Sequence, residues 1–305
     1  MPLEGMDLDS LVFLVGVPRS GTSLLYKLLC LHPEVAYISN WLQLAPGLPF
    51  LSLLNRLAPV FPGTRRAVWF GADGANAYVH GRHRSRRERL FPMPIEGSRL
   101  YQRYGIDYLG PDGRPDPARL RRLREALAAV RRYSGGHVVV TKYLGNNHHI
   151  PELVELFPTA RFVNIVRDGR AVAFSLSQVY WWQDTLIWWY GGTPERWQAE
   201  GRDPWELCAR HWVQDLAVID DGLAAVPASR RLQIRYEELI AGPVPTVRRI
   251  AAFAGLREDR GWSRELTRLY YPDKNEIWRA RLTPSARQQV EAVQHGDLRR
   301  LGYLT

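Results

Sequence analysis

The pattern of hydrophobic and polar residues is clearest near the start of the chain, at residues 11–25. An unbroken apolar run at 11–15 predicts a short buried strand. Gly16 and Gly21 then predict a turn, and the amphipathic pattern that begins at Thr22 predicts a helix. Glycines let a backbone approach an anion closely, and the first turn of a helix offers N–H groups to it. The stretch therefore predicts a cradle for an anion.

Hydrophobic patterns typical of strands and of helices alternate along the rest of the chain. Further strands are expected at about 35–37, 138–140, 161–166 and 232–234. Helices are expected from near Ala171 and at about 116–132, 150–157, 205–224, 243–254, 260–270 and 283–294. Residues 41–57 are apolar with proline breaks and are expected to be helical and buried, whereas 59–97 are expected to be irregular. Strands that alternate with helices predict an α/β fold, in which helices flank a parallel sheet with its ligand site at the strand C-termini.

Composition narrows the class of protein. The 305 residues, 46% of them hydrophobic, suit one large α/β domain or a domain with a cap. The first ten residues contain no lysine or arginine, so no secretory signal is expected, and no apolar run reaches the ~18 residues of a membrane span. Cys30 and Cys208 fall in helical patterns and are expected to be buried thiols, as in a cytoplasmic protein. His148 and His149 are adjacent, and no cluster has metal-ligand spacing.

The net charge of +10 comes mainly from arginine. Only three of the 41 basic residues are lysines, namely Lys27, Lys142 and Lys274. In such a chain a lysine marks a position where a compact charge is favoured. A basic run at 82–89 leaves open a nucleic-acid-binding protein, but no regular aromatic residues accompany it, so a solvated loop without nucleic acid is the preferred interpretation.

The cation of the glycine loop is Arg19. The spacing G-x-x-x-x-G-T-S differs from a Walker A loop, which has Lys where this chain has Thr22. Lys27 lies too far into the helix to replace it. A P-loop nucleotide or small-molecule kinase stays an alternative, although no acid ends the 138–140 strand to hold Mg²⁺.

The loop sequence Pro-Arg-Ser-Gly-Thr-Ser at 18–23 resembles the 5′-phosphosulfate loop of the sulfotransferases that use 3′-phosphoadenosine 5′-phosphosulfate (PAPS). It has the arginine-bearing form of the bacterial and tyrosylprotein branches. Three more segments match the family's pattern in order, and a weaker one resembles the Asn-x-x-Trp-Arg of bacterial members. These segments are 138–142, 161–175, 234–239 and 275–279.

This resemblance extends over about residues 10–300 and is loose over 40–135. It implies a single sulfotransferase domain with a P-loop-like sheet and an acceptor-side insertion at about 40–135. It also implies a reaction without a metal, in which PAPS gives a sulfuryl group to a hydroxyl or amine of a small-molecule, carbohydrate or lipid-like acceptor and leaves PAP. Positioning and charge neutralisation carry most of the catalysis in the analogous phosphoryl transfer.

The resemblance assigns a role to the loop and to the strand end beside it. Arg19 and Lys142 would stabilise the charge that grows on the leaving phosphate oxygen. The 5′-phosphate would be held by the loop, whose residues are Arg19, Ser20, Gly21, Thr22 and Ser23.

The later segments would hold the rest of the donor. Arg167 and Ser175 stand in the positions of the 3′-phosphate segment, and Tyr236 takes the place of the tyrosine beside the adenine. Lys274 or Arg279 would lie near phosphate.

The family's acceptor base does not carry over. Cytosolic members have a catalytic His two residues after the Lys that matches Lys142, where this chain has Leu144. Tyrosylprotein members have a Glu in the region where this chain has Ser-Asn at 39–40. A carboxyl group beside an apolar acceptor can act as a base, so Glu96 is the first candidate. The alternatives are His148 and His149. The aromatic stretch at 180–190 fits either acceptor binding or a core.

Overall fold

The computed structural model describes residues 10–71, 89–107 and 115–304. Five strands in these ranges form one parallel sheet in the order β2-β3-β1-β4-β5. They are β1 (Leu11–Val15), β2 (Val35–Ala36), β3 (Val138–Lys142), β4 (Arg161–Val166) and β5 (Arg231–Arg235). The predicted α/β fold is therefore confirmed. Because β1 lies in the centre, the loop that follows it opens at the middle of the sheet's C-terminal edge.

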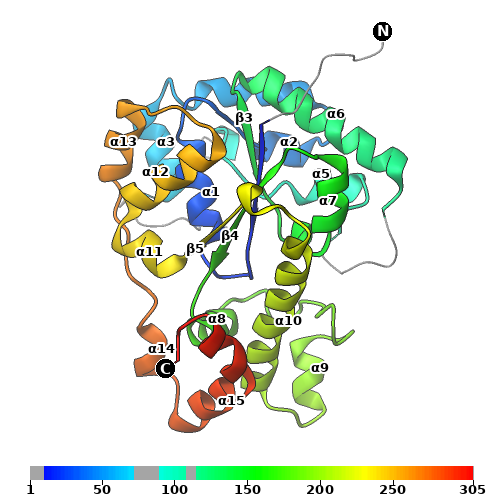
Figure 1. Ribbon diagram of the computed structural model, residues 1–305, viewed down its shortest axis with the longest axis vertical. Coiled ribbons are helices and arrows are strands. Elements are labelled where there is room, and N and C mark those ends of the chain that lie inside the picture. The colour runs from blue at the N-terminus through cyan, green and yellow to red at the C-terminus, as the bar shows by residue number, and fades with distance from the viewer. Residues whose placement is uncertain (1–9, 72–88, 108–114, 305) are drawn as a thin grey trace.

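Helices cover both faces of the sheet (Figure 1). One face carries α1 (Thr22–Cys30), α3 (Pro62–Phe70), α11 (Tyr236–Ala241), α12 (Pro243–Ala254) and α13 (Arg260–Thr267). The core on the other face includes α5 (Ser98–Arg103), α6 (Pro117–Ser134), α7 (Ile150–Leu156), α8 (Gly169–Ser177), α10 (Pro204–Ala224) and α15 (Pro284–Arg300). Shorter described elements are α2 (Asn40–Leu44), α9 (Pro194–Ala199), α14 (Ile277–Arg281) and the 3₁₀ helices η1 (Pro49–Leu57), η2 (Leu144–His148) and η3 (Ala228–Arg230).

The side chains of β1 show why this run forms the central strand. Alternate residues of a strand point to opposite faces, and both faces here are buried. Phe13 joins the core beneath α10, where its ring stacks on Phe162 with centroids 5.2 Å apart. Val12 and Leu14 join the core beneath α1. Burial on both sides accounts for the continuous apolar run in the sequence.

Several expectations need correction. The region 59–97 is not irregular throughout, since α3 occupies 62–70 with a proline in its first turn and a buried Trp69. Residues 41–57 are partly helical as expected, but much of their apolar surface faces outward. The strand expected at 138–140 continues through Lys142, which is the last residue of β3 rather than lying past its end. The basic positions 82–87 lie outside the described residues.

The cysteines and the longer helices follow the sequence closely. Cys30 and Cys208 are buried free thiols, as predicted. α12 has its predicted bounds, whereas α15 continues to Arg300, beyond the expected end. Among the described residues, no helix is long and apolar enough to cross a bilayer, and no group of His, Cys, Asp and Glu has the arrangement of a metal site.

Two helical glycines give a matched test of this packing. A Cβ at Gly222 in α10 would lie 2.8 Å from the Cβ of Ile150, whereas one at Gly296 in α15 would meet nothing within 4 Å. Gly222→Ala should lower the free energy of unfolding by about 1–3 kcal/mol through overpacking. Gly296→Ala should raise it by about 0.5–1 kcal/mol, because alanine loses less backbone entropy in a helix. Denaturant unfolding measures both changes in the free energy of unfolding. Changes of the same sign in the two variants would contradict the packing described.

Candidate active site

The loop after β1 has a backbone that requires glycine at two positions. Gly16 has φ +153°, and a Cβ there would lie 2.6 Å from the carbonyl oxygen of Ile165. Gly21 has φ +95°, and a Cβ there would lie 2.5 Å from the ring of Tyr236. Among the residues that the structure describes, Arg19 is the one non-glycine residue with a positive φ, at +72°. The loop is thus packed tightly between β4 and the start of α11.

The N-terminus of α1 faces this loop. No side chain caps the helix, and its first turn contains no acidic residue. Ser20 is fully buried, and its hydroxyl has no hydrogen-bond partner among the described residues. Thr22 is buried and Ser23 is half-buried. The loop therefore brings helix N–H groups and hydroxyls together, which is the arrangement that binds a phosphate or sulfate.

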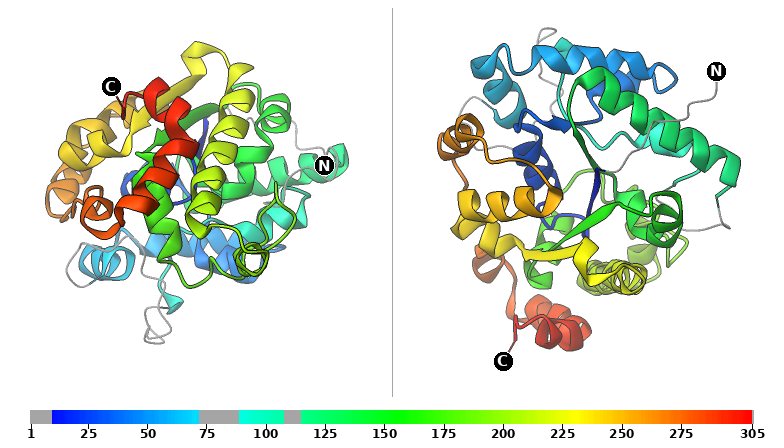
Figure 2. Two further views of the ribbon diagram at one scale, coloured as in Figure 1. Left: turned by 90° about the horizontal axis from the view of Figure 1, so that it is seen from below. Right: turned by 45° about the horizontal axis from the view of Figure 1, so that its top comes forward.

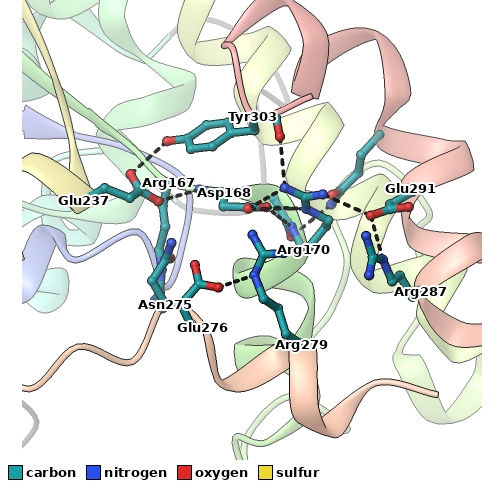
Figure 3. Close-up of polar contacts among 12 residues, drawn as sticks. Arg167, Asp168, Arg170, Glu237, Asn275, Glu276, Arg279, Arg287, Glu291 and Tyr303 are labelled. Atoms are coloured by element: carbon teal, nitrogen blue, oxygen red, sulfur yellow. Dashed lines mark hydrogen bonds and ion pairs between the residues drawn. The ribbon is translucent and has the colours of Figure 1, made fainter. Parts of the chain in front are cut away.

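The buried guanidinium of Arg167 connects the loop to the C-terminal part of the chain. Its Nη1 donates to the carbonyl oxygen of Arg19 at 2.9 Å, and its Nη2 donates to the carbonyl oxygen of Lys274 at 3.1 Å. Its Nε donates to Oδ1 of Asn275 at 3.0 Å (Figure 3). The guanidinium carbon lies 4.2 Å from the ring centroid of Tyr236. Arg167 thus ties three segments of the chain to the end of β4.

Ser175 joins the same group through Arg19. Nε of Arg19 donates to Oγ of Ser175 at 2.9 Å. Because α8 begins at Gly169 rather than near Ala171 as expected, Ser175 lies nearly two turns into the helix. The residues predicted for the 5′-phosphate and those predicted for the 3′-phosphate are therefore in direct contact, although 156 positions separate Arg19 and Ser175.

A cavity of about 250 Å³ opens beside these residues. Six of the predicted binding residues line it, namely Arg19, Gly21, Arg167, Ser175, Tyr236 and Lys274. Apolar side chains from α1, α3, α8 and residues 269–272 form much of the remaining wall. Arg279 does not line it, since its side chain pairs with Glu276 and lies 4.9 Å from the ring centroid of Trp278 (Figure 3).

Lys142 and Glu96 form an ion pair on the other side of the loop. The Lys142 side chain is 3% exposed, whereas that of Glu96 is 40% exposed. Glu96 is positioned by pairing of its segment with the residues after β2, where the N–H of Ile95 donates to the carbonyl oxygen of Ile38 at 3.0 Å. The structure therefore joins two predicted catalytic residues that do not line the cavity.

The two candidate histidines point to different surroundings. The ring of His148 packs edge-on against Trp188, and burial is the main cause of its lowered pKa. Nδ1 of His149 lies 3.9 Å from Oε2 of Glu152, and burial likewise lowers the pKa of His149. Both side chains are buried. An acceptor in solvent can therefore reach Glu96 more directly than either ring.

The aromatic stretch at 180–190 divides into a core part and a surface part. Trp182 is buried, and Nε1 of Trp188 donates to Oδ1 of the buried Asp215 at 2.7 Å. Tyr180 is 85% exposed and Trp181 is 38% exposed. The core interpretation therefore holds for the inner rings, while the outer rings are accessible to a ligand.

Asn147 is a site residue that the sequence analysis missed. Its Nδ2 donates to the carbonyl oxygen of Gly16 at 3.0 Å, and its Oδ1 accepts from the N–H of Gly16 at 3.3 Å. This pair of bonds from η2 fixes the point where the loop leaves β1. No local signal reveals it, because 131 positions separate the two residues.

The start of α8 is braced by a second missed group. Asp168 caps the helix by accepting from the N–H of Arg170, and the two side chains form a buried ion pair with N–O distance 2.8 Å. Arg170 also pairs with Glu291 and donates to the carbonyl oxygen of Tyr303 (Figure 3). The adjacent carboxylates raise the pKa of Arg170 although burial opposes them. These contacts fix α8, and therefore Ser175, against α15.

Glu237 supports the same end of α8. Its Oε1 accepts from the N–H of Asp168 at 3.2 Å, and its Oε2 accepts from the hydroxyl of Tyr303 at 3.0 Å. Glu237 belongs to a segment that matches the family, but it does not line the cavity. Its carboxylate instead holds the backbone just after β4 in place.

Comparison with known proteins agrees with this geometry. A profile described as the sulfotransferase family matches residues 11–260. The omega-hydroxy-beta-dihydromenaquinone-9 sulfotransferases Stf3 of Mycobacterium bovis and Mycobacterium tuberculosis are each 24% identical to this chain, in an alignment of 268 positions that covers 81% of it. The alignment spans 63% of each relative, so the chain covers less than two thirds of their length.

Solved structures share the fold at lower identity. Sulfotransferase STF9 from Mycobacterium avium has a TM-score of 0.59 and 16% identity, with 96% of this chain and 77% of that chain covered. Sulfotransferase STF1 from Mycobacterium tuberculosis has a TM-score of 0.51 and 18% identity, with 93% and 75% covered. Since the family profile spans all five described strands and the loop after β1, the chain belongs to the sulfotransferase family.

Proposed function

We propose that this protein transfers a sulfuryl group from PAPS to a hydroxyl group of a lipid-like small molecule. The observation that carries the proposal is the contact of Arg167 with the loop at Arg19, which puts two anion-binding groups on one cavity. PAPS carries phosphate at both ends of its ribose, so it matches two such groups. A nucleotide with a single phosphate position does not use both.

The cavity suggests how the donor would lie. The loop amides, Thr22 and Ser23 would hold the 5′-phosphosulfate at the N-terminus of α1. Ser175 and the guanidinium of Arg167 would hold the 3′-phosphate, since an arginine fork suits phosphate oxygens. Tyr236 would lie along the adenine. In this arrangement Arg167 both binds the donor and braces the loop.

The Lys142–Glu96 pair would serve the transfer step. The acceptor oxygen attacks sulfur, the bond from sulfur to the 5′-phosphate oxygen breaks, and PAP leaves with the bond's electrons. Glu96 takes the acceptor's hydroxyl proton. Arg19 and Lys142 compensate the negative charge that grows on the leaving oxygen. Glu96 is favoured over the histidines because its side chain is partly exposed and contacts Lys142.

The acceptor class rests on two observations. The curated relatives are named for a hydroxylated menaquinone, and the outer rings of the 180–190 stretch are exposed. Aromatic faces pack well on apolar chains and rings. A hydroxylated isoprenoid quinone is therefore the first acceptor to test, followed by phenols, sterols and sugars.

The direct test incubates the protein with ³⁵S-labelled PAPS and this acceptor panel. Labelled product should form together with one equivalent of PAP. Transfer of a phosphoryl group from ATP with Mg²⁺, and none of sulfur from PAPS, would show a P-loop kinase instead.

Donor selectivity can be tested with PAP and AMP, which differ by the 3′-phosphate. Arg167→Ala should weaken the binding of PAP on the order of 10- to 100-fold, because a hydrogen bond to a charged group contributes roughly 1.5–3 kcal/mol. The binding of AMP should weaken much less, and calorimetry measures the affinities of both ligands. Arg279→Ala is the matched control, since Arg279 lies outside the cavity. Equal weakening of PAP and AMP would make Arg167 purely a brace.

Substitutions of Lys142 and of Glu96 should change kcat and its pH dependence in different ways. Lys142→Met should lower kcat on the order of 10²–10³ while the pH profile keeps its acidic limb. Glu96→Gln should lower kcat on the order of 10²–10⁴ and flatten that limb, because the proton acceptor is gone. Both variants break the same contact, so a merely structural pair would give two similar pH profiles. Loss of the limb in His148→Gln, but not in Glu96→Gln, would move the base to the histidine.

A further inference from the structure

The helix η1 has its hydrophobic pattern reversed. Ser52 and Asn55 face inward and are buried, and Nδ2 of Asn55 donates to the carbonyl oxygen of Tyr37 at 2.8 Å. Phe50 and Leu53 face outward and are 50% and 52% exposed. A surface helix normally buries its apolar side and shows water its polar side. The reversal indicates that the outer side of η1 meets something apolar.

The exposed side chains continue beyond η1 on both sides. Between residues 44 and 61, seven large apolar side chains are 46% to 65% exposed. They are Leu44, Leu48, Phe50, Leu53, Leu57, Val60 and Phe61, and together we call them the outer apolar face. Single exposed apolar residues are ordinary, but a concentration of seven in 18 residues marks an interaction surface. In Figure 2 (left) the segment lies on the side opposite α15.

The charged side chains of residues 35–72, the stretch that contains this face, are all basic. No Asp or Glu occurs in the sequence between Glu34 and Asp73. Arg56 and Arg66 are exposed within the segment. The side chain of Arg65 is already compensated by its ion pair with Glu265 from α13. A partner for this face should therefore be apolar in its interior and negatively charged at its surface.

We propose that the outer apolar face docks on the surface of a bilayer that contains anionic lipids. Apolar side chains would enter the boundary of the headgroups and acyl chains, while the arginines contact lipid phosphates. This mode of binding needs no membrane-spanning helix. A second copy of the chain suits the face less well, because in a two-fold contact the same stretch of the partner would offer no Asp or Glu to pair with Arg56 and Arg66.

The face also adjoins the proposed acceptor side. Asn40, at the start of α2, donates to the carbonyl oxygen of Phe91 and accepts from the N–H of Met93, three residues before Glu96. A lipid-like acceptor held in the bilayer would thus be presented near Glu96. This last step rests on the proposed function, whereas docking itself does not.

The experiment is flotation of the whole chain with vesicles of phosphatidylcholine alone or with 30% phosphatidylglycerol. The wild type should float with the anionic vesicles, less with neutral ones, and less at high salt. Phe50→Ser/Leu53→Ser should weaken binding by about 10- to 100-fold, because two large apolar side chains no longer enter the lipid. Leu44→Ser/Val60→Ser, at the most exposed positions of the face, should act the same way.

The matched control is Leu186→Ser/Ile277→Ser, which removes two exposed apolar side chains outside the outer apolar face and should leave flotation unchanged. PAP affinity, measured alongside, should be unchanged in both pairs of variants at the outer apolar face, which separates this proposal from the proposed function. Failure of the wild type to float would overturn docking. So would a wild-type dimer, detected by light scattering, that becomes monomeric in Phe50→Ser/Leu53→Ser.

Discussion

The site depends on the burial of one cation. A guanidinium taken out of water must be surrounded by hydrogen-bond acceptors, or the structure pays its full desolvation cost. Arg167 meets this requirement with two backbone carbonyls and an amide oxygen from the 19 loop and the 274–275 segment, and with the face of Tyr236. Since these groups come from three parts of the chain besides the end of β4, Arg167 links the segments that line the cavity.

The sheet explains why the two halves of the site lie close together. β1 pairs with β3 on one side and with β4 on the other, and Leu14 is in register with Lys142. The loop after β1 therefore opens between Lys142 at the end of β3 and Arg167 just beyond β4. The residues proposed to bind the donor lie on the Arg167 side of the loop, and the ion pair of Glu96 with Lys142 lies on the other side. A sulfuryl group held at the loop would have an acceptor approaching from the side opposite the nucleotide, as in-line transfer requires.

Sequence reasoning found the features that local pattern encodes. The buried run of β1, the glycine loop and the strand–turn–helix at Arg167 follow from alternation, glycine spacing and polarity within about fifteen residues. Asn147 and the brace around Arg170 escaped it, because their partners are far along the chain. The apolar run at 41–57 predicts a buried helix, but the apolar side of η1 faces outward, because such a run by itself does not show which side packs on the core. Of the two cations that the C-terminal segment offers, Lys274 lines the cavity, whereas Arg279 pairs with Glu276 outside it.

The central claim is that one cavity holds both phosphates of the donor. The most direct measurement is a crystal structure of the protein with PAP. The account predicts the 5′-phosphate at the N-terminus of α1 and the 3′-phosphate within hydrogen-bond distance of Ser175 and Arg167. PAP bound with neither phosphate at these two places, or bound outside this cavity, would contradict it.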